Sequence, residues 1–290
     1  MKSLWKNEEA EGFSKDPLQL RVYTSRLLGA NPDLVLHGGG NTSVKLSQKN
    51  FFGETEELLL VKGSGWDLAT IESPGFAPVR LETLKRLAEL ETLSDCEMVR
   101  QQRAAMTDPG APNPSVEAIL HALIPFRYVD HTHADAVLAV TNHPDGEQSI
   151  QEIYGPRVIV IPYVMPGFAL AKKVRELTQN KNWSDYEGMI LMNHGIFTFD
   201  DDAQESYEKM ILLVSEAEDY VRAQGSKEAP KAKVQEDLVA LAGIRKKVSE
   251  TAGKAMLAVI DQSDQSGGFS SREDISEIGI SSTESKCPDI

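Results

Sequence analysis

Apolar positions recur along this chain in two spacings, and the spacing changes at turns rich in glycine or proline. Residues 16–30 carry apolar side chains at helical spacing. Asp16 precedes Pro17 there, the order of cap and first-turn proline that begins a helix. Residues 201–223 show the same spacing after an acidic start, which predicts a long amphipathic helix.

Short apolar runs alternate with further helical patterns. Runs bounded by turn residues predict strands within residues 34–46 on both sides of a glycine turn, 57–68, 127–134, 155–164 and 189–200. Helices are predicted within residues 80–106, 114–124, 134–142 and 167–179. In the second of these, Asn113 is the expected cap and Pro114 opens the first turn. The alternation predicts one α/β domain.

The last sixty or so residues have a different composition. Residues 233–260 predict one more helix, whereas residues 262–290 are rich in serine, glycine and acidic side chains, a composition typical of disorder. We therefore expect a catalytic domain over residues 16–225, a helical extension over 226–261 and a disordered tail over 262–290.

Composition and charge restrict the class of protein. With 290 residues and 41% hydrophobic content, the chain can bury one substantial core. Its net charge of −14 repels phosphate backbones and anionic lipid, which argues against nucleic-acid and membrane-surface binding. Cys96 and Cys287 lie far apart, which argues against a disulfide framework. The N-terminal residues resemble no signal peptide, and no apolar run reaches bilayer length. We expect a cytoplasmic protein.

Three histidines are candidate metal ligands. His131 and His133 lie two apart in a predicted strand, so both imidazoles project from one face. His194 lies at a glycine junction between two predicted strands. Three imidazoles with an open fourth position are typical of a catalytic zinc site, although cobalt, manganese or iron also suit them. Taken singly, the pair could be solvated or packed, and His194 could donate to a backbone carbonyl.

Glu117 is a candidate general base. It lies in the first turn of a predicted helix whose N-terminal amides would attract an anion, with Ser115 beside it. An acidic residue that complements the helix dipole is the alternative interpretation. His121 follows four residues later on the same helical face, where it either contacts Glu117 or forms an ordinary surface pair.

Two glycine-rich segments are candidate anion sites. Residues 37–43 and 62–65 offer backbone amides, hydroxyl groups and Asn41, and Lys62 can add positive charge. Neither segment completes a Walker loop or a dinucleotide fingerprint, and plain tight turns are the alternative. Tyr163 precedes a glycine after a predicted strand. Its phenol can protonate an alkoxide, or the ring can simply cover a loop.

In chain order, the segments HGGGNTS, KGSG, PSVEAILH, DHTHA, IPYVMPG and NHG form a series that resembles the class II aldolase/adducin family over roughly residues 20–225. The sequence of these segments is most similar to the aldolase half of proteins in which an aldolase domain is fused to a short-chain dehydrogenase. The resemblance implies an α/β/α sandwich on a mostly antiparallel central sheet.

The resemblance also implies roles for individual residues. Glu117 would be the base, and Tyr163 would protonate the aldehyde oxygen. His131, His133 and His194 would bind Zn²⁺ or another divalent transition metal. The substrate phosphate would contact Asn41, Thr42, Ser64, Gly65 and Ser115. Val116 stands where many relatives have a second serine, and the stretch between His133 and Tyr163 is longer than usual, so the substrate stays open.

The implied activity is metal-dependent aldol cleavage of a ketose phosphate or related sugar through a stabilised enediolate, a lyase reaction of carbohydrate metabolism. A homotetramer and a separate dehydrogenase partner are further expectations. An epimerase or dehydratase acting on a pentulose phosphate is an alternative within the family. A non-catalytic, adducin-like interaction module is another, although a scaffold has no physical need for three histidines and Glu117 together.

Overall fold

One mixed sheet organises the first 225 residues. The structure, a computed structural model, describes residues 1–225, 231–234 and 237–276. Contacts between residues divide the chain into two compact units, Met1–Gly225 and Ser226–Ile290.

The sheet of the first unit has seven strands in the order β3-β2-β1-β4-β7-β6-β5. Their bounds are β1 Asn41–Lys49, β2 Thr55–Lys62, β3 Phe76–Arg80, β4 Tyr128–Thr132, β5 Val158–Ile161, β6 Gly188–Leu191 and β7 Gly195–Asp200. Every neighbouring pair is antiparallel except β5 with β6. The predicted, mostly antiparallel sheet is therefore confirmed.

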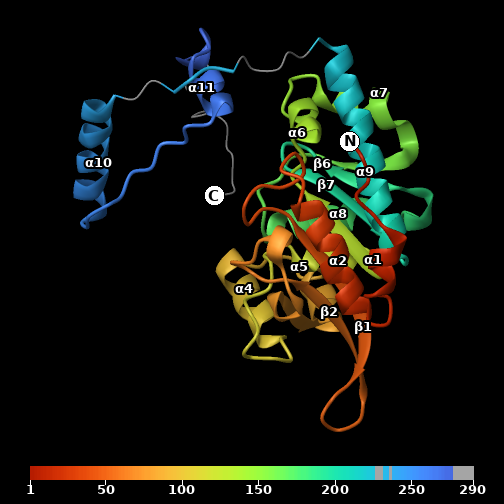
Figure 1. The fold of residues 1–290 in the computed structure, drawn as a ribbon. Helices are drawn as coiled ribbons and strands as arrows, with labels where there is room; N and C mark the ends of the chain where they lie inside the picture. The colour runs from red at the N-terminus through yellow and green to blue at the C-terminus, as the bar shows by residue number, and fades with distance from the viewer. Residues whose placement is uncertain (226–230, 235–236, 277–290) are drawn as a thin grey trace. The chain divides into compact units, whose positions relative to one another are not determined.

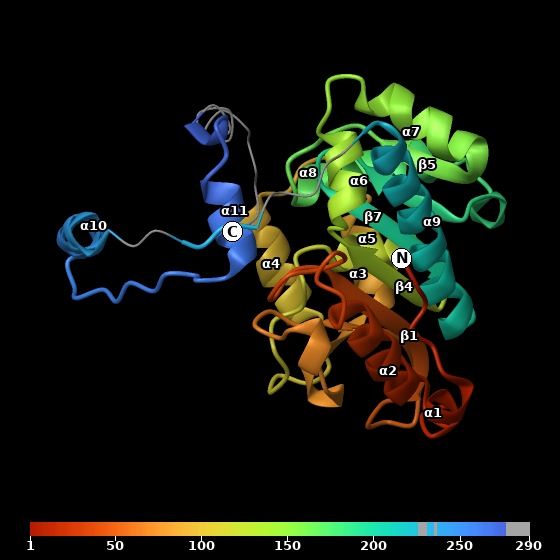
Figure 2. The same ribbon diagram turned by 45° about the horizontal axis from the view of Figure 1, so that its top comes forward.

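Helices cover both faces of this sheet. One face packs against α2 (Pro17–Gly29), α6 (Asp135–Thr141), α7 (Gly146–Tyr154) and α9 (Ala203–Ala223). The other packs against α3 (Leu81–Leu87), α4 (Asp95–Ala104), α5 (Ala118–Leu123) and α8 (Phe168–Thr178). Figure 1 shows α2 and α9 across the first face, and Figure 2 shows α6 and α7 beside α9. The predicted three-layer α/β/α arrangement is confirmed.

Short elements complete the first unit. They are α1 (Asn7–Glu11) and the 3₁₀ turns η1 (Leu68–Thr70), η2 (Ser73–Gly75), η3 (Gly155–Arg157) and η4 (Trp183–Asp185). None of the described helices is both long enough and apolar enough to span a bilayer.

Helix α2 begins as its sequence predicts. The Asp16 carboxylate accepts a hydrogen bond from the Leu18 amide at 2.9 Å, and Pro17 occupies the first turn. The cap satisfies an amide that has no partner within the helix.

Helix α5 begins later than predicted. Asn113 and Pro114 were expected to open it, but the helix starts at Ala118, with Glu117 at its N-cap. The reason is tertiary: Ser115 N donates to Lys62 O at 3.1 Å, and Pro114 forms an isolated bridge with Gly63. Pairing with the end of β2 holds this segment extended, and the helix begins after it.

The strand expected just before the first glycine turn is also absent from the described chain. Leu34 and Val35 are buried in a loop instead, and only the strand after the turn, β1, forms. Gly40 ends the turn with φ +63°, and a Cβ there would lie 2.6 Å from Val35 Cγ1 and 2.8 Å from His131 O. A glycine is therefore required where this loop meets β4.

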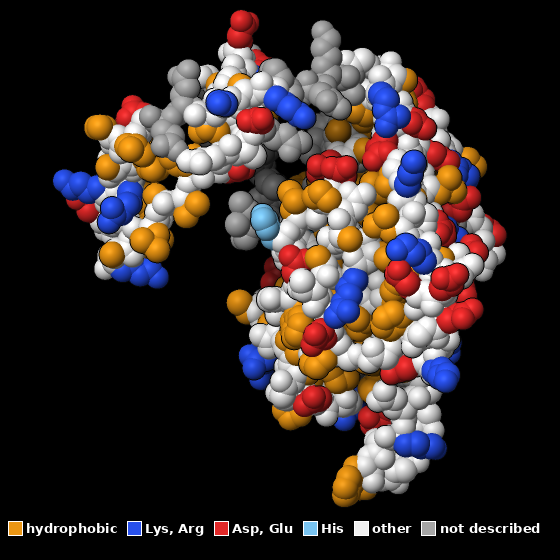
Figure 3. All heavy atoms as spheres, in the orientation of Figure 1, with side chains coloured by type: hydrophobic (Ala, Val, Ile, Leu, Met, Phe, Trp, Pro, Cys, Tyr) orange, Lys and Arg blue, Asp and Glu red, His pale blue; other side chains and the backbone are white. Residues whose placement is uncertain are grey.

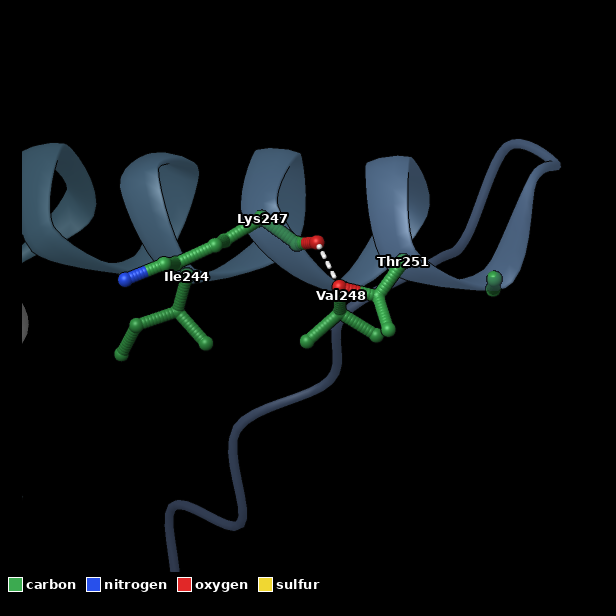
Figure 4. A pocket seen from close by; sticks show the side chains of 5 residues that line it. Ile244, Lys247, Val248 and Thr251 are labelled. Atoms are coloured by element: carbon green, nitrogen blue, oxygen red, sulfur yellow. Dashed lines mark hydrogen bonds between the residues drawn. The ribbon is translucent and has the colours of Figure 1, made fainter.

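The second unit contains α10 (Leu238–Ala252) and α11 (Asp264–Ser270). The helical extension predicted after the sheet domain is thus present as α10. Figure 4 shows Ile244 and Val248 on one side of α10, with Thr251 donating to Lys247 O at 3.0 Å. Helix α11 lies within the segment predicted to be disordered, and residues 277–290 of that segment lie outside the described residues.

The surface of the first unit mixes charges of both signs. Figure 3 shows acidic and basic side chains interspersed with apolar ones over the visible face. The turn between β1 and β2 carries Phe51 and Phe52, which are 97% and 82% exposed, and this hairpin extends away from the helices at the bottom of Figure 1.

A buried ion pair joins α2 to the middle of the sheet. Arg21 and Asp130 have fully buried side chains that form a salt bridge. Ser206 of α9 donates to the other oxygen of Asp130 at 2.5 Å. Asp130 directly precedes His131 in β4 and projects to the opposite face of the sheet, so this network holds the strand in place from the α2 side.

Arg21→Ala should destabilise the fold strongly, because it leaves the Asp130 carboxylate buried without its cation. The expected loss is about 3–5 kcal/mol in the free energy of unfolding, measured by urea denaturation. Lys6→Ala, which removes the exposed pair with Glu9, is the control and should change the midpoint little. A loss no larger than the control's would contradict the anchoring role.

Candidate metal centre

Alternation along β4 places His131, and His133 directly follows the end of the strand. His131 pairs with Asn41 of β1 on one side and Phe197 of β7 on the other. Its side chain shares a face with Val129 and points toward the layer that contains α5, whereas Asp130 points to the α2 side. His131 is fully buried, and the ring of Phe197 stacks on it at 4.1 Å between centroids.

The three predicted histidines come together. One ring nitrogen each of His131, His133 and His194 lies within 4.8 Å of the others. His131 Nε2 and His133 Nε2 are 3.0 Å apart. The ring centroids lie 4.9 to 5.1 Å from one another.

The chemistry of these rings fits a divalent ion. His131 Nδ1 lies 3.0 Å from Ile196 O, so Nδ1 carries the hydrogen and Nε2 presents a lone pair to the cluster. Burial, together with His133 and His194, lowers the pKa of His131 well below its ordinary value, which keeps the ring neutral. Two nitrogens bound to one tetrahedral zinc lie about 3.3 Å apart, close to the separation found here.

A tight turn places His194 beside His131 and His133. Residues 192–194 connect β6 to β7, and Asn193 adopts a left-handed conformation with φ +59°. A Cβ on Gly195 would lie 2.4 Å from Thr132 O and 3.1 Å from His131 Cε1. Glycine therefore lets the turn approach β4 closely enough for the rings to meet.

Glu117 lies beside the histidines, as the N-cap residue of α5. Its Oε2 is 3.3 Å from His131 Nε2, and its Oε1 is 3.4 Å from His194 Nε2. The residue is 5% exposed. Among the described residues, no group donates a hydrogen bond to Oε1. A buried carboxylate with one uncommitted oxygen next to a candidate ion site is suited to proton transfer.

Asn41 holds the other oxygen of Glu117. Its Nδ2 donates to Glu117 Oε2 at 2.6 Å and to Ser115 Oγ at 3.1 Å. Its Oδ1 hydrogen-bonds His121 Nε2. Both amide hydrogens are engaged within the protein, so the side chain of Asn41 has none left for the phosphate contact that was predicted.

His121 is buried and belongs to this polar network. Its Nδ1 lies 2.8 Å from Ser43 Oγ, and its ring is fully buried. The surface pair with Glu117 that the sequence left open is therefore wrong. A signal was present: Asn41 and Ser43 share one face of a strand, and Glu117 and His121 share one face of a helix.

The two glycine-rich loops meet near Glu117. Lys62 donates to Gly38 O at 2.8 Å, which joins the second loop to the first. Burial lowers the pKa of Lys62, while the carboxylates of Asp67 and Glu117 oppose that shift. Ser64 and Gly65 are exposed, and Ser64 N donates to Asn113 O at 2.8 Å.

Thr42 and Tyr163 are the remaining predicted site residues. Thr42 points to the opposite face of β1, where it is fully buried and its hydroxyl lies 2.7 Å from Ser25 Oγ. That position does not suit the predicted phosphate contact. Tyr163 is half-buried in the loop that follows β5, at the same end of the sheet as His194, because Met192 N donates to Ile161 O.

Comparison with known proteins shows the class to which this fold and cluster belong. The family model for the Class II Aldolase and Adducin N-terminal domain matches residues 19–221. The chain therefore belongs to the class II aldolase/adducin family, as its motifs had suggested.

Similar proteins agree with this family. The N-terminal class II aldolase domain of a conserved protein from Thermoplasma acidophilum is 40% identical, with a TM-score of 0.70, and the match covers 77% of this chain and all of that one. A sugar-phosphate aldolase from Thermotoga maritima is 16% identical, with a TM-score of 0.50 and coverage of 71% and 94%. At that identity the likeness shows the fold alone.

A longer relative is known from Bacillus subtilis (strain 168). It bears the name "Uncharacterized oxidoreductase YuxG" and is 37% identical over 221 residues, which are 76% of this chain and 32% of the relative. The chain thus spans about a third of the length of the curated relative that it matches.

Removing a bound metal should lower the stability of the folded protein. Loading with Zn²⁺ at about 100 times its dissociation constant should stabilise the native state by about 2.7 kcal/mol, because the unfolded chain lacks the assembled cluster. His194→Ala should abolish most of this gain, measured by thermal unfolding with and without chelator. His143→Ala, at an exposed histidine, is the matched control. Equal gains in both variants would contradict the assignment.

Acid should destabilise the metal-free protein. Burial lowers the pKa of His121 well below its usual value, so below about pH 6.5 the unfolded chain takes up a proton that the folded chain cannot. Above that pH His121 does not affect the free energy of unfolding. Below it, the free energy of unfolding falls as the pH drops, by at most about 1.4 kcal/mol per pH unit for each such histidine. Urea titrations at several pH values should show a shallower decline for His121→Gln. An unchanged slope would argue against the assignment.

Proposed function

We propose that this chain is a divalent-metal-dependent aldolase, a carbon–carbon lyase that cleaves a ketose phosphate or a related sugar. The observation that supports this most is the position of the Glu117 carboxylate, 3.3 Å from His131 Nε2 and 3.4 Å from His194 Nε2. A base and a candidate ion site are thus adjacent, as removal of a proton beside a carbonyl group requires. The name of the Thermotoga maritima structure agrees with this substrate class.

In this proposal His131, His133 and His194 hold the ion, Zn²⁺ or another divalent transition metal. When bound, the ion supplies Lewis-acid stabilisation of negative charge on the substrate's oxygen atoms. Glu117 transfers the proton at carbon through Oε1, because Oε2 already accepts a hydrogen bond from Asn41.

Tyr163 is the proposed acid for the aldehyde oxygen in the condensation direction and the base in cleavage. Its loop follows β5, which pairs in parallel with β6, the strand that leads into the His194 turn. A phenol can carry out both steps because it can donate and accept a proton.

The rim formed by Ser64, Gly65 and Ser115 is the proposed site for the substrate's phosphate. Ser115 Oγ accepts hydrogen bonds from Asn41 Nδ2 and Glu117 N, and neither bond uses the hydroxyl hydrogen, which can therefore be donated to a phosphate oxygen. Lys62 contributes positive charge behind the rim. Asn41 and Thr42 are left out of this site, because their side chains are committed within the protein.

A homotetramer in the cytoplasm, with residues 16–225 as the catalytic domain, completes the proposal. Residues 226–261 would form the helical extension and residues 262–290 the tail. The name and the greater length of the Bacillus subtilis relative support a dehydrogenase partner. Nucleic acid is not a proposed partner, given the net charge of −14.

Glu117→Gln tests this proposal. The variant should retain bound metal, because the amide preserves the size of the side chain and the three imidazoles are untouched. Exchange of the substrate's α-proton with D₂O should fall by about 10²–10⁴-fold, because an amide cannot accept the proton. The assay follows deuterium incorporation by NMR across a panel of ketose phosphates that begins with the smallest, dihydroxyacetone phosphate.

The control is Glu147→Gln, at an exposed residue of α7. It should exchange at the wild-type rate. Wild-type exchange in Glu117→Gln, or no exchange with any ketose phosphate in the metal-loaded wild type, would rule out the proposal.

A further inference from the structure

A buried series of hydrogen bonds leads from strand β1 to the carboxylate of Glu117. Ser43 Oγ lies 2.8 Å from His121 Nδ1, and His121 Nε2 hydrogen-bonds Asn41 Oδ1. Asn41 Nδ2 then donates to Glu117 Oε2 at 2.6 Å. Ser43 and His121 are fully buried, and Asn41 and Glu117 are 6% and 5% exposed. The four side chains therefore exchange few hydrogen bonds with solvent.

Only one arrangement of hydrogens satisfies the whole series. An ionised carboxylate can only accept, so Asn41 must present its NH₂ group to Glu117 and its carbonyl oxygen to His121. His121 must then carry its hydrogen on Nε2. A neutral imidazole with hydrogen on Nε2 has a lone pair on Nδ1, which accepts the hydroxyl hydrogen of Ser43. Burial favours this neutral ring, because it lowers the pKa of His121 well below the ordinary value.

We propose that His121 is a positioning residue for the catalytic carboxylate: its Nε2–H fixes the orientation of the Asn41 amide, which in turn holds Oε2 of Glu117. The two carboxylate oxygens thereby become different. Oε2 is held by Asn41, and Oε1, to which no described group donates a hydrogen bond, remains available for the proton. This inference rests on the proposed function, in which Glu117 is the base.

The alternative is that His121 merely fills space. Its ring contacts Phe197 edge-on, with 5.3 Å between centroids, so a truncation would also disturb packing. Two variants of similar size separate these roles. His121→Leu keeps apolar volume without a donor, whereas His121→Gln places an amide N–H where it can reach Asn41 Oδ1.

The tautomer of His121 is the first test and needs neither metal nor substrate. ¹⁵N NMR of the histidine rings in the full-length, metal-free chain should show the hydrogen of His121 on Nε2. Ser43→Ala should weaken this preference, because Nδ1 then loses its donor. Hydrogen on Nδ1 in the wild type would overturn the inference.

Kinetics are the second test. With the most active ketose phosphate, His121→Leu should lower kcat and α-proton exchange by about 10–100-fold at unchanged KM and metal content, as loss of a group that orients a site residue typically does. His121→Gln should recover most of the loss. In a Glu117→Gln background, His121→Leu should add no further loss, because both changes remove the same function.

Tyr154→Phe is the matched control, since it deletes another buried hydrogen bond, from Tyr154 Oη to Leu213 O at 2.8 Å, on the α7 side of the sheet. It should lower stability and leave kcat unchanged. Wild-type exchange in His121→Leu would overturn the positioning role while Glu117→Gln stays inactive. Wild-type exchange in Glu117→Gln, with the Nε2 tautomer intact, would instead overturn the proposed function.

Discussion

Burial of a carboxylate beside neutral imidazoles is the constraint on which the rest of this structure depends. Glu117, His131 and His194 are each less than a tenth exposed, and such groups are costly to bury unless each finds a partner. The fold supplies these partners from several elements. Backbone of β7 orients His131, and Asn41 of β1 holds Glu117. The layered architecture therefore allows polar groups that are far apart in the sequence to form hydrogen bonds with one another.

Local chemistry was readable from the sequence wherever the interacting groups are close along the chain. Asp16 caps α2 as predicted, and strand alternation correctly placed His131 on the face opposite Asp130. The pattern of apolar positions could not predict that His194 lies beside His131, because the turn of His194 lies more than sixty residues further along the chain. The ordered motifs of the family suggested that convergence, and the sheet order β4-β7-β6 explains it.

The predictions that failed concern contacts between segments remote in the chain. Pro114 was expected inside a helix, but pairing with the end of β2 keeps it extended. A surface pair of His121 with Glu117 was one open interpretation, yet the ring of His121 is fully buried beside Asn41 and Ser43. Helix α7 was not predicted at all. Propensity and periodicity report what a segment can form alone, and here tertiary hydrogen bonds decide what it forms in place.

The bridge between Gly63 and Pro114 has a mechanical consequence. Together with the hydrogen bond from Ser115 N to Lys62 O, it joins the second glycine-rich loop, residues 62–65, to the segment that ends at Glu117. An anion that bound to this loop and displaced it by a fraction of an ångström would also displace the backbone of Glu117. Binding of the charged end of a substrate would thus change the position of the Glu117 carboxylate, through a connection only a few residues long.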